Sequence, residues 1–374
     1  MMEQGGDLSE QDQPAVAALR GRILLHTRTL KAAALADRTS DGTILCGAGA
    51  LGDVKDALRY LGTLPVLADP AHYEEKFAGV SASFYVKPRS DTGRLLTLPP
   101  DMDRPGQDQL AAGVTAALTP TRYFAAGDDM AVSAATRRMQ QFDASQVIFT
   151  VPLAAEWLQS DRDVRFLIGA LNKVPHLKAL AFGSAGDPLP DRGAARRLRS
   201  MIDNINDVAL IRTGLAGLDA YARGAAFVSI GMQKSCRAFR PPDAAGQPDA
   251  NRSGRPKSYV LHPDLMQYFR TDALAHLYGF TTPPLCGCTV CNGQSLTRFS
   301  DDPDDVREAE QHNLATWLPW AEELQEASPD DRRYLWRDRC YTAIQAHEHA
   351  GLQWRSRRDP GPPAGLSLWA TQED

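Results

Sequence analysis

The sequence predicts an α/β protein folded as a (β/α)8 TIM barrel, followed by a zinc-binding segment and further helices. Short apolar runs alternate with segments of helical periodicity from residue 22 to residue 231. Strands that are apolar on both sides belong to parallel sheets with both faces covered. About eight such strand–helix units are the content of a closed barrel. A doubly wound open sheet is the alternative arrangement of the same units.

The individual elements follow from the two periodicities. Short apolar runs predict strands, at 22–25, 43–46, 64–69, 146–150, 177–183, 207–211 and 225–231. Helical patterns predict helices, at 54–60, 109–117, 131–141, 160–172, 192–204 and 217–223. After residue 235 the alternation stops, and a polar loop rich in glycine and proline precedes helices expected at 262–278, 303–326 and 330–350.

These elements suggest one main domain with short additions. Residues 1–14 are acidic and polar and are expected to be a disordered lead. The barrel domain is expected at 15–326, with the zinc site at 286–312. A C-terminal helix is expected at 327–355, and the Pro/Gly-rich residues 356–374 are expected to be a loose tail.

Composition sets limits on the function. The chain of 374 residues is 43% hydrophobic and 23% charged, as in ordinary globular proteins. Its net charge of −5 means that any contact with nucleic acid requires a local basic patch. No apolar run reaches the roughly 18 residues of a membrane span, and the N-terminus lacks the apolar core of a signal peptide. Thiolates reserved for a metal fit a reducing compartment, so we expect a cytoplasmic protein.

Three closely spaced cysteines and one histidine form the most specific motif. Cys286, Cys288 and Cys291 form a C-x-C-x-x-C hook, and His312 follows within a helical segment. Four such ligands complete a tetrahedral, closed zinc site, whereas a catalytic zinc keeps one position open for water. Buried, inert thiols are the alternative, and burial is the interpretation for the scattered cysteines, Cys46, Cys236 and Cys340. The motif predicts a structural Zn²⁺ ion.

A basic patch precedes the hook. It comprises six residues within a short stretch, interleaved with Phe239 and Tyr259: Lys234, Arg237, Arg240, Arg252, Arg255 and Lys257. Basic side chains neutralise phosphates, and aromatic rings stack on bases. A solvated loop is the alternative, since charge runs are usually solvated. The position of the patch between the expected last barrel strand and the hook favours nucleic acid.

The zinc motif, with Asn313 and Leu314 after His312, resembles that of the tRNA-guanine transglycosylase superfamily. The spacing to the histidine is somewhat shorter here than is usual in that family. Other matches depend on their order along the chain: the strand 64–69, the glycine-rich loop 179–188, and the strand–helix–strand segment 208–229. The resemblance therefore covers about residues 60–325.

The resemblance implies exchange of guanine for a 7-deazaguanine, such as 7-cyano-7-deazaguanine, in DNA or tRNA. Asp69 matches a family aspartate at a strand end and is the expected catalytic base; a turn-capping aspartate before Pro70 is the alternative. The base-binding loop would be Gly183, Ser184, Gly186 and Asp187. Ser229 stands where the family has its attacking aspartate, and no histidine is evident in the sequence to activate a serine.

Two functions are therefore expected as alternatives. The first is a base-exchange enzyme of the pentosyltransferase type, similar to the branch of the family that inserts 7-deazaguanines into DNA. The second is a catalytically inactive transglycosylase-like subunit that binds nucleic acid or pairs with a catalytic partner, as a homodimer or heterodimer. Thr150 lies near the family's base-recognition aspartate, and neither Asp187 nor Asp219 matches a family motif. A carboxylate facing Asp69 across a base-sized pocket would favour the enzyme.

Overall fold

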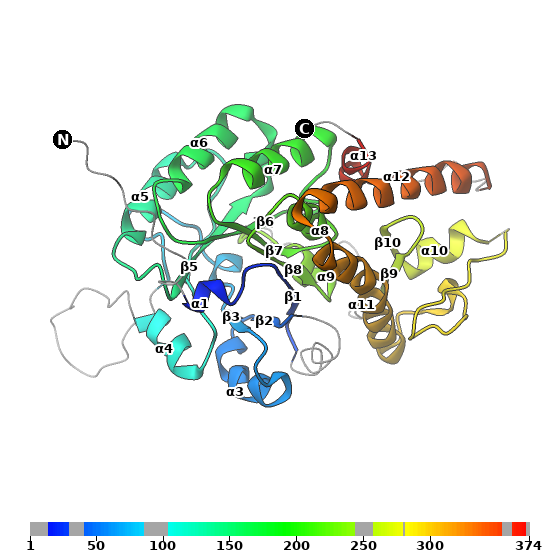
Figure 1. Cartoon of the computed structure of the whole chain (residues 1–374), viewed down its shortest axis with the longest axis horizontal. Coiled ribbons are helices and arrows are strands. Elements are labelled where there is room, and N and C mark those ends of the chain that lie inside the picture. Colours follow the sequence, from blue (N-terminus) through cyan, green and yellow to red (C-terminus); the bar gives the residue numbers. More distant parts are fainter. Residues whose placement is uncertain are drawn as a thin grey trace.

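Eight parallel strands form a nearly closed barrel with helices outside, as shown by a computed structural model of the chain (Figure 1). The structure describes residues 14–29, 41–85, 104–243, 257–279, 281–353 and 361–371. The strands are β1 (Arg22–Thr27), β2 (Thr43–Cys46), β3 (Val66–Asp69), β4 (Ala117–Leu118), β5 (Val147–Ala154), β6 (Lys178–Gly183), β7 (Val208–Thr213) and β8 (Phe227–Gly231). Their order is β3-β2-β1-β8-β7-β6-β5-β4. The predicted TIM-barrel class is confirmed, because the two ends of the sheet meet.

The barrel closes between β3 and β4. The amide of Thr115 donates to the carbonyl of Val66 over 2.9 Å, and the Val66 amide donates to the Thr115 hydroxyl over 3.1 Å. The sequence did not predict β4, and the helix expected at 109–117 is wrong in its second half. Helix α4 (Arg104–Ala112) ends at Gly113, whose φ of 100° lies outside the range of helices.

The outer helices lie close to their expected positions. They are α3 (Ala50–Leu61), α5 (Asp129–Met139), α6 (Asp161–Leu171), α7 (Arg192–Asn204) and α8 (Ala216–Ala222). Side-chain caps define where three of them begin, α5 being capped by the Asp128 carboxylate, which accepts from the Ala131 amide. The Ser160 hydroxyl accepts from the amides of Arg162 and Asp163, and the Asp191 carboxylate accepts from that of Ala194. Short elements complete the barrel: α1 (Pro14–Ala17), η2 (His72–Glu74), η3 (Ala155–Gln159) and α9 (Lys234–Arg237).

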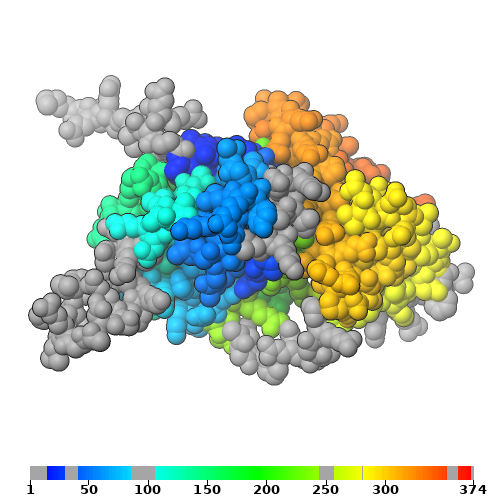
Figure 2. All heavy atoms as spheres, turned by 90° about the horizontal axis from the view of Figure 1, so that it is seen from below, coloured from blue at the N-terminus to red at the C-terminus, as the bar shows by residue number. Residues whose placement is uncertain are grey.

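The cysteine hook belongs to a lobe beside the barrel (Figure 2). The lobe contains the antiparallel strands β9 (Tyr259–His262) and β10 (Gln267–Arg270), then α10 (Thr271–Leu277) and η4 (Leu296–Arg298). The helix predicted at 262–278 is therefore wrong over its first half. Pro263 and the left-handed φ of Met266 (47°) turn the chain between the two strands. Helix α11 (Pro303–Glu326) lies between the lobe and the barrel (Figure 1).

The C-terminal part is more ordered than the sequence predicted. Helix α12 (Pro329–Gln353) is followed by α13 (Ala364–Trp369), which packs against α7 and α12. Leu366, Leu368 and Trp369 are buried, so the prediction of a loose tail at 356–374 is wrong for this segment. The sequence alone did not show which elements the apolar side chains of this short segment pack against. The expected lead at 1–14 lies outside the described residues except for Pro14.

Within the described segments, none of the helices combines the length and apolarity that a membrane span requires.

Trp369→Ala should destabilise the protein by about 3 kcal/mol, because it removes a large buried side chain from the contact between α13 and the barrel helices. The indole is 7% exposed, and its ring centroid lies 6.1 Å from that of Trp336. Denaturant unfolding would measure the change. Tyr334→Ala is the control, since that ring is 59% exposed and its loss should cost within about 0.5 kcal/mol. Equal effects of the two substitutions would show that α13 adds nothing to the fold.

Candidate functional site

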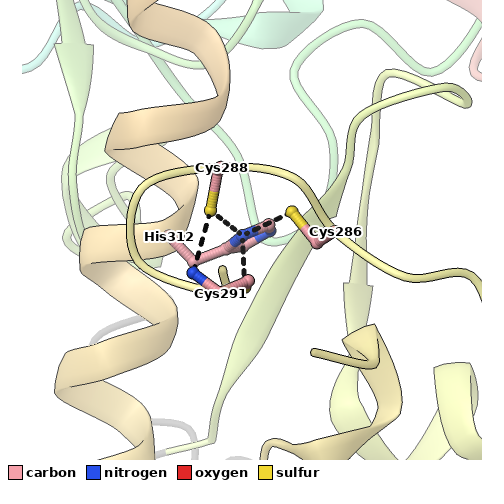
Figure 3. A group of neighbouring side chains, drawn as sticks. All are labelled: Cys286, Cys288, Cys291 and His312. Carbon is pink, nitrogen blue, oxygen red and sulfur yellow. Dashed lines mark hydrogen bonds between the residues drawn. The ribbon is translucent and has the colours of Figure 1, made fainter. Parts of the chain in front are cut away.

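Cys286, Cys288, Cys291 and His312 converge on one point (Figure 3). The three sulfurs lie 3.6, 3.4 and 3.3 Å from His312 Nδ1, respectively. Tetrahedral coordination with metal–ligand bonds of about 2.0–2.3 Å places sulfur and nitrogen ligands about 3.6 Å apart. The predicted ligand set is therefore assembled, and its geometry fits a metal ion.

Hydrogen bonds around the four ligands orient them toward that point. His312 Nε2 lies 2.8 Å from the carbonyl oxygen of Leu261. Because Nε2 must carry the proton to donate this bond, Nδ1 keeps its lone pair for a metal. The hook is shaped by the left-handed residues Asn292 and Gly293, which turn the chain so that the Gly293 amide donates to the Cys286 carbonyl over 2.8 Å. A metal bound here would hold β9, the hook and α11 together.

Burial disfavours the ionised form of two of the thiols when no metal is bound. It raises the pKa of Cys291 to about 12, and it also raises the pKa of Cys286. A metal ion replaces the thiol protons, so protons and metal compete for the same sulfurs. Retention of the metal should therefore weaken as the pH falls.

Asp69 ends β3 at the barrel mouth, as predicted, but it is only 2% exposed. Both of its carboxylate oxygens already accept hydrogen bonds. Oδ1 accepts from the amide of Ala71 over 2.9 Å, and Oδ2 accepts from the hydroxyl of Tyr73. Burial raises the pKa of Asp69, although the nearby Arg212 guanidinium opposes the shift. Asp69 does not line the cleft that the loop at Ser184 forms.

Ser229 has a histidine neighbour that the sequence did not reveal. Its hydroxyl lies 3.1 Å from Nδ1 of His26, and it accepts from the amide of Arg212 over 3.0 Å. His26 Nε2 lies 3.8 Å from Oδ2 of Asp69. The Ser229 hydroxyl, the His26 ring and the Asp69 carboxylate thus lie next to one another in space as a nucleophile, a base and an acid do in some enzymes. However, Ser229 and His26 are completely buried. A substrate has no access to the Ser229 hydroxyl in this arrangement.

Arg212 is the central charge of the mouth, and sequence reasoning missed it. Its guanidinium donates to the Tyr73 hydroxyl over 3.0 Å, to the Ser235 carbonyl over 2.7 Å, and to Glu74. Arg28 donates to the same Glu74 carboxylate. Burial raises the pKa of Glu74, but the two guanidiniums outweigh it and hold this pKa below its usual value. A charged residue within the otherwise apolar run of β7 was the available signal.

Phe239 packs against the first residue of the predicted base-binding loop. The ring is buried, with its centroid 4.5 Å from that of Tyr73. It lies so close to Gly183 that an added Cβ would meet it at 2.5 Å. The Ser184 amide donates to the Phe239 carbonyl over 2.9 Å. The predicted loop residue Gly183 therefore packs beneath an aromatic ring and does not lie in the cleft wall.

A cleft of about 1270 Å³ opens beside this packed mouth. The loop residues Ser184, Gly186 and Asp187 line it together with four residues of the predicted basic patch, Lys234, Arg237, Arg240 and Lys257. Arg252 and Arg255 lie outside the described residues. With Arg28, Arg212 and Arg270, the lining holds seven basic side chains against three acidic ones, Glu74, Asp187 and Glu310. The predicted base-binding loop and the predicted basic patch thus line the same cleft.

Aromatic rings position several of these cations. The Arg237 guanidinium lies 3.8 Å from the ring centroid of Tyr268, and Lys234 Nζ lies 4.7 Å from that of Tyr259. Lys257 forms an ion pair of 2.7 Å with Asp301, which neutralises part of its charge. Two other residues considered from the sequence do not line the cleft. Asp219 pairs with Arg199 over 2.7 Å on the outside of the barrel, and Thr150 is buried in β5.

Comparison with family models and with curated proteins finds no match to this chain. The roles of the residues above are therefore argued from geometry and chemistry.

Cys288→Ala should remove about one equivalent of bound metal per chain and lower the yield of folded protein, because metal binding is coupled to folding. Elemental analysis of the purified protein would measure the loss. Cys340→Ala is the control, since this cysteine is buried outside the cluster. An unchanged metal content in Cys288→Ala would contradict the assignment of the four ligands.

Gly183→Ala should destabilise the protein by about 1–3 kcal/mol, because the new methyl group would overlap the Phe239 ring. Gly186→Ala is the matched control in the same loop, since its added Cβ would meet nothing within 4 Å. Thermal unfolding of both variants would compare them. If Gly183→Ala were as stable as Gly186→Ala, the ring would not be held as tightly as its contacts indicate.

Proposed function

We propose that this protein is a transglycosylase-like barrel that binds nucleic acid in the cleft at its mouth, and that its Cys3His site holds a structural zinc ion. The observation that carries the proposal is the clustering of seven basic side chains in one cleft of a chain whose net charge is −5. Such a local concentration of positive charge attracts a polyanion even where the whole molecule is acidic.

Zinc is the ion that best suits the metal site. Three thiolates and one imidazole are soft or borderline ligands, which favour zinc over magnesium or calcium. Four protein ligands complete a tetrahedron and leave no position for a substrate or water. The ion would then stabilise the fold of the lobe and would not act as a Lewis acid in catalysis.

The cleft offers the two kinds of contact that nucleic acids need. Lys234 and Arg240 are exposed and reach solvent at the cleft, where they can neutralise phosphates. Tyr259 and Tyr268 also line it, and each already lies against a cation. An unpaired base stacks on such aromatic surfaces regardless of its identity. The side chains at the cleft therefore favour a single-stranded or locally opened segment.

The loop 184–187 would give the cleft its contact to base edges. The Ser184 hydroxyl accepts from the Gly186 amide over 3.1 Å, and Asp187 Oδ1 accepts from the Leu189 amide over 2.9 Å. These bonds hold the loop in one conformation at the edge of the cleft. The Asp187 carboxylate has a second oxygen, which can accept a hydrogen bond from a base.

The packing of the mouth supports binding over base exchange. Exchange needs a carboxylate that reaches the sugar carbon, whereas the oxygens of Asp69 accept bonds from Ala71 and Tyr73. Ser229 is fully buried, and Phe239 occupies the space next to Gly183. A catalytic partner, in a heterodimer, would then supply the nucleophile for any reaction on the bound strand.

Replacing Arg237, Arg240 and Lys257 together by alanine should weaken binding to a single-stranded oligonucleotide and reduce its salt slope by up to about three, because each lost phosphate contact removes about one released counterion. Fluorescence anisotropy at several salt concentrations would measure both quantities. The matched control removes three arginines, Arg137, Arg162 and Arg165, from α5 and α6, which carry no cleft residue. The control should bind like the wild type.

If the cleft and control variants bind equally, the cleft is a solvated basic surface and the proposal fails. An assay for incorporation of labelled guanine into DNA or tRNA tests the competing function. Exchange by the protein alone that disappears in Asp69→Asn would establish an enzyme in place of a binding subunit.

A further inference from the structure

A second group of metal-ligating side chains lies at the barrel mouth, separate from the cysteine hook. His26, Cys46 and Asp69 come from β1, β2 and β3, and Cys46 and Asp69 are the last residues of their strands. One ligand atom from each residue lies within 4.8 Å of the other two. The three side chains are 0%, 5% and 2% exposed. Neighbouring parallel strands thus bring nitrogen, sulfur and oxygen donors to one buried point.

The histidine of this group has a nitrogen without a partner. His26 Nε2 is fully buried and has no hydrogen-bond partner among the described residues. Its other nitrogen, Nδ1, is held by the Ser229 hydroxyl at 3.1 Å. Buried polar atoms are nearly always satisfied, and a metal-binding histidine usually has its second nitrogen fixed by a hydrogen bond. Both features are those of an imidazole oriented toward an ion.

The carboxylate of this group is fixed in the same manner. Asp69 accepts from the Ala71 amide and the Tyr73 hydroxyl, so its orientation does not depend on the ion. Ligands held in advance by surrounding hydrogen bonds are characteristic of metal sites. We propose that His26, Cys46 and Asp69 bind a divalent transition-metal ion of the zinc class, and that Ser229 is the positioning residue for His26.

The charges around the group are compatible with such an ion. A thiolate at Cys46 and the carboxylate of Asp69 together neutralise a divalent cation, and the Cys46 proton leaves to solvent on binding. Arg28 and Arg212 are the cations nearby, and both donate to Glu74, which compensates part of their charge. Burial and the Asp69 carboxylate raise the pKa of Cys46 well above its ordinary value, and the positive charges of Arg212 and Arg28 offset only part of this rise. Nitrogen, sulfur and carboxylate donors together suit zinc and do not suit magnesium or calcium.

Three protein ligands leave one position of a tetrahedral ion open, but this ion would join strands of the barrel and would not act on a strand bound in the cleft. None of its three ligands lines the cleft, so a bound polynucleotide would not touch it. It would join β1, β2 and β3, the three strands on one side of the seam at which β3 meets β4. The serine at the position of the family's nucleophile would then serve to orient a ligand.

Metal content of the full chain tests the proposal. After dialysis against a weak chelator, elemental analysis of the wild type should give about two equivalents, one from each site. Cys46→Ala should lower the content to about one equivalent, and Cys288→Ala should remove the other. Cys340→Ala, the control for loss of a buried cysteine outside both groups, should keep the wild-type content. A Cys46→Ala variant with the wild-type metal content overturns the proposal.

If Cys46→Ala does not fold, titration with Co²⁺ tests whether the second metal site exists. Co²⁺ added to metal-free wild type should fill two sites with different thiolate-to-metal absorption, since one site has three sulfurs and the other has one. Ser229→Ala keeps all the ligands and should weaken the one-sulfur site by about 10- to 100-fold, the usual effect of losing a bond that orients a ligand. Saturation of the wild type by a single equivalent, or unchanged affinity in Ser229→Ala, would refute the second site or the role of Ser229, respectively.

Discussion

The buried guanidinium of Arg212 constrains the whole barrel mouth. A charge taken out of water is tolerated only where hydrogen bonds and counter-charges replace its hydration. Here the bonds come from segments far apart in the chain: Tyr73 and Glu74 after β3, and the Ser235 carbonyl after β8. Once these partners are in place, Tyr73 covers Asp69 and the ring of Phe239 packs against Tyr73. The tight packing at the base of the mouth thus follows from the hydrogen bonds and counter-charge that the buried Arg212 guanidinium requires.

Helix α11 connects the Cys3His cluster to the cleft wall. Its residue His312 contacts the thiols, and Asn313 holds β9 by accepting from the Leu261 amide over 2.6 Å and donating to the Tyr259 carbonyl over 2.7 Å. One turn earlier, Glu310 accepts from Gln233 over 3.3 Å at the cleft. The helix therefore positions Tyr259 through Asn313, the residue that follows the candidate metal ligand His312. Order in the lobe and the shape of the cleft are linked by direct contacts.

Local patterns were predictable from the sequence, and long-range packing was not. The barrel strands and the hook of Cys286, Cys288 and Cys291 could be recognised because they depend on residues close together in the chain. The two-residue strand β4 is too short to give a pattern, and α13 is helical because it packs against α7 and α12. The position of Asp69 at a strand end was also predictable. Its burial was not, since the Tyr73 hydroxyl that bonds it packs in turn against Phe239 from a distant segment. The contact of His26 with Ser229 likewise joins residues 203 positions apart.

The pairing of β1 with β8 has a consequence for biosynthesis. These two strands are neighbours in the sheet, so the ring cannot close until the chain has been synthesised through Gly231. Contacts between distant residues form slowly because the loop between them must first be ordered. Until then, the backbone N–H and C=O groups of β1 and β7 that later pair with β8 have no partner strand. The lobe that carries the Cys3His cluster is synthesised later still, so it can fold against a ring that has already closed.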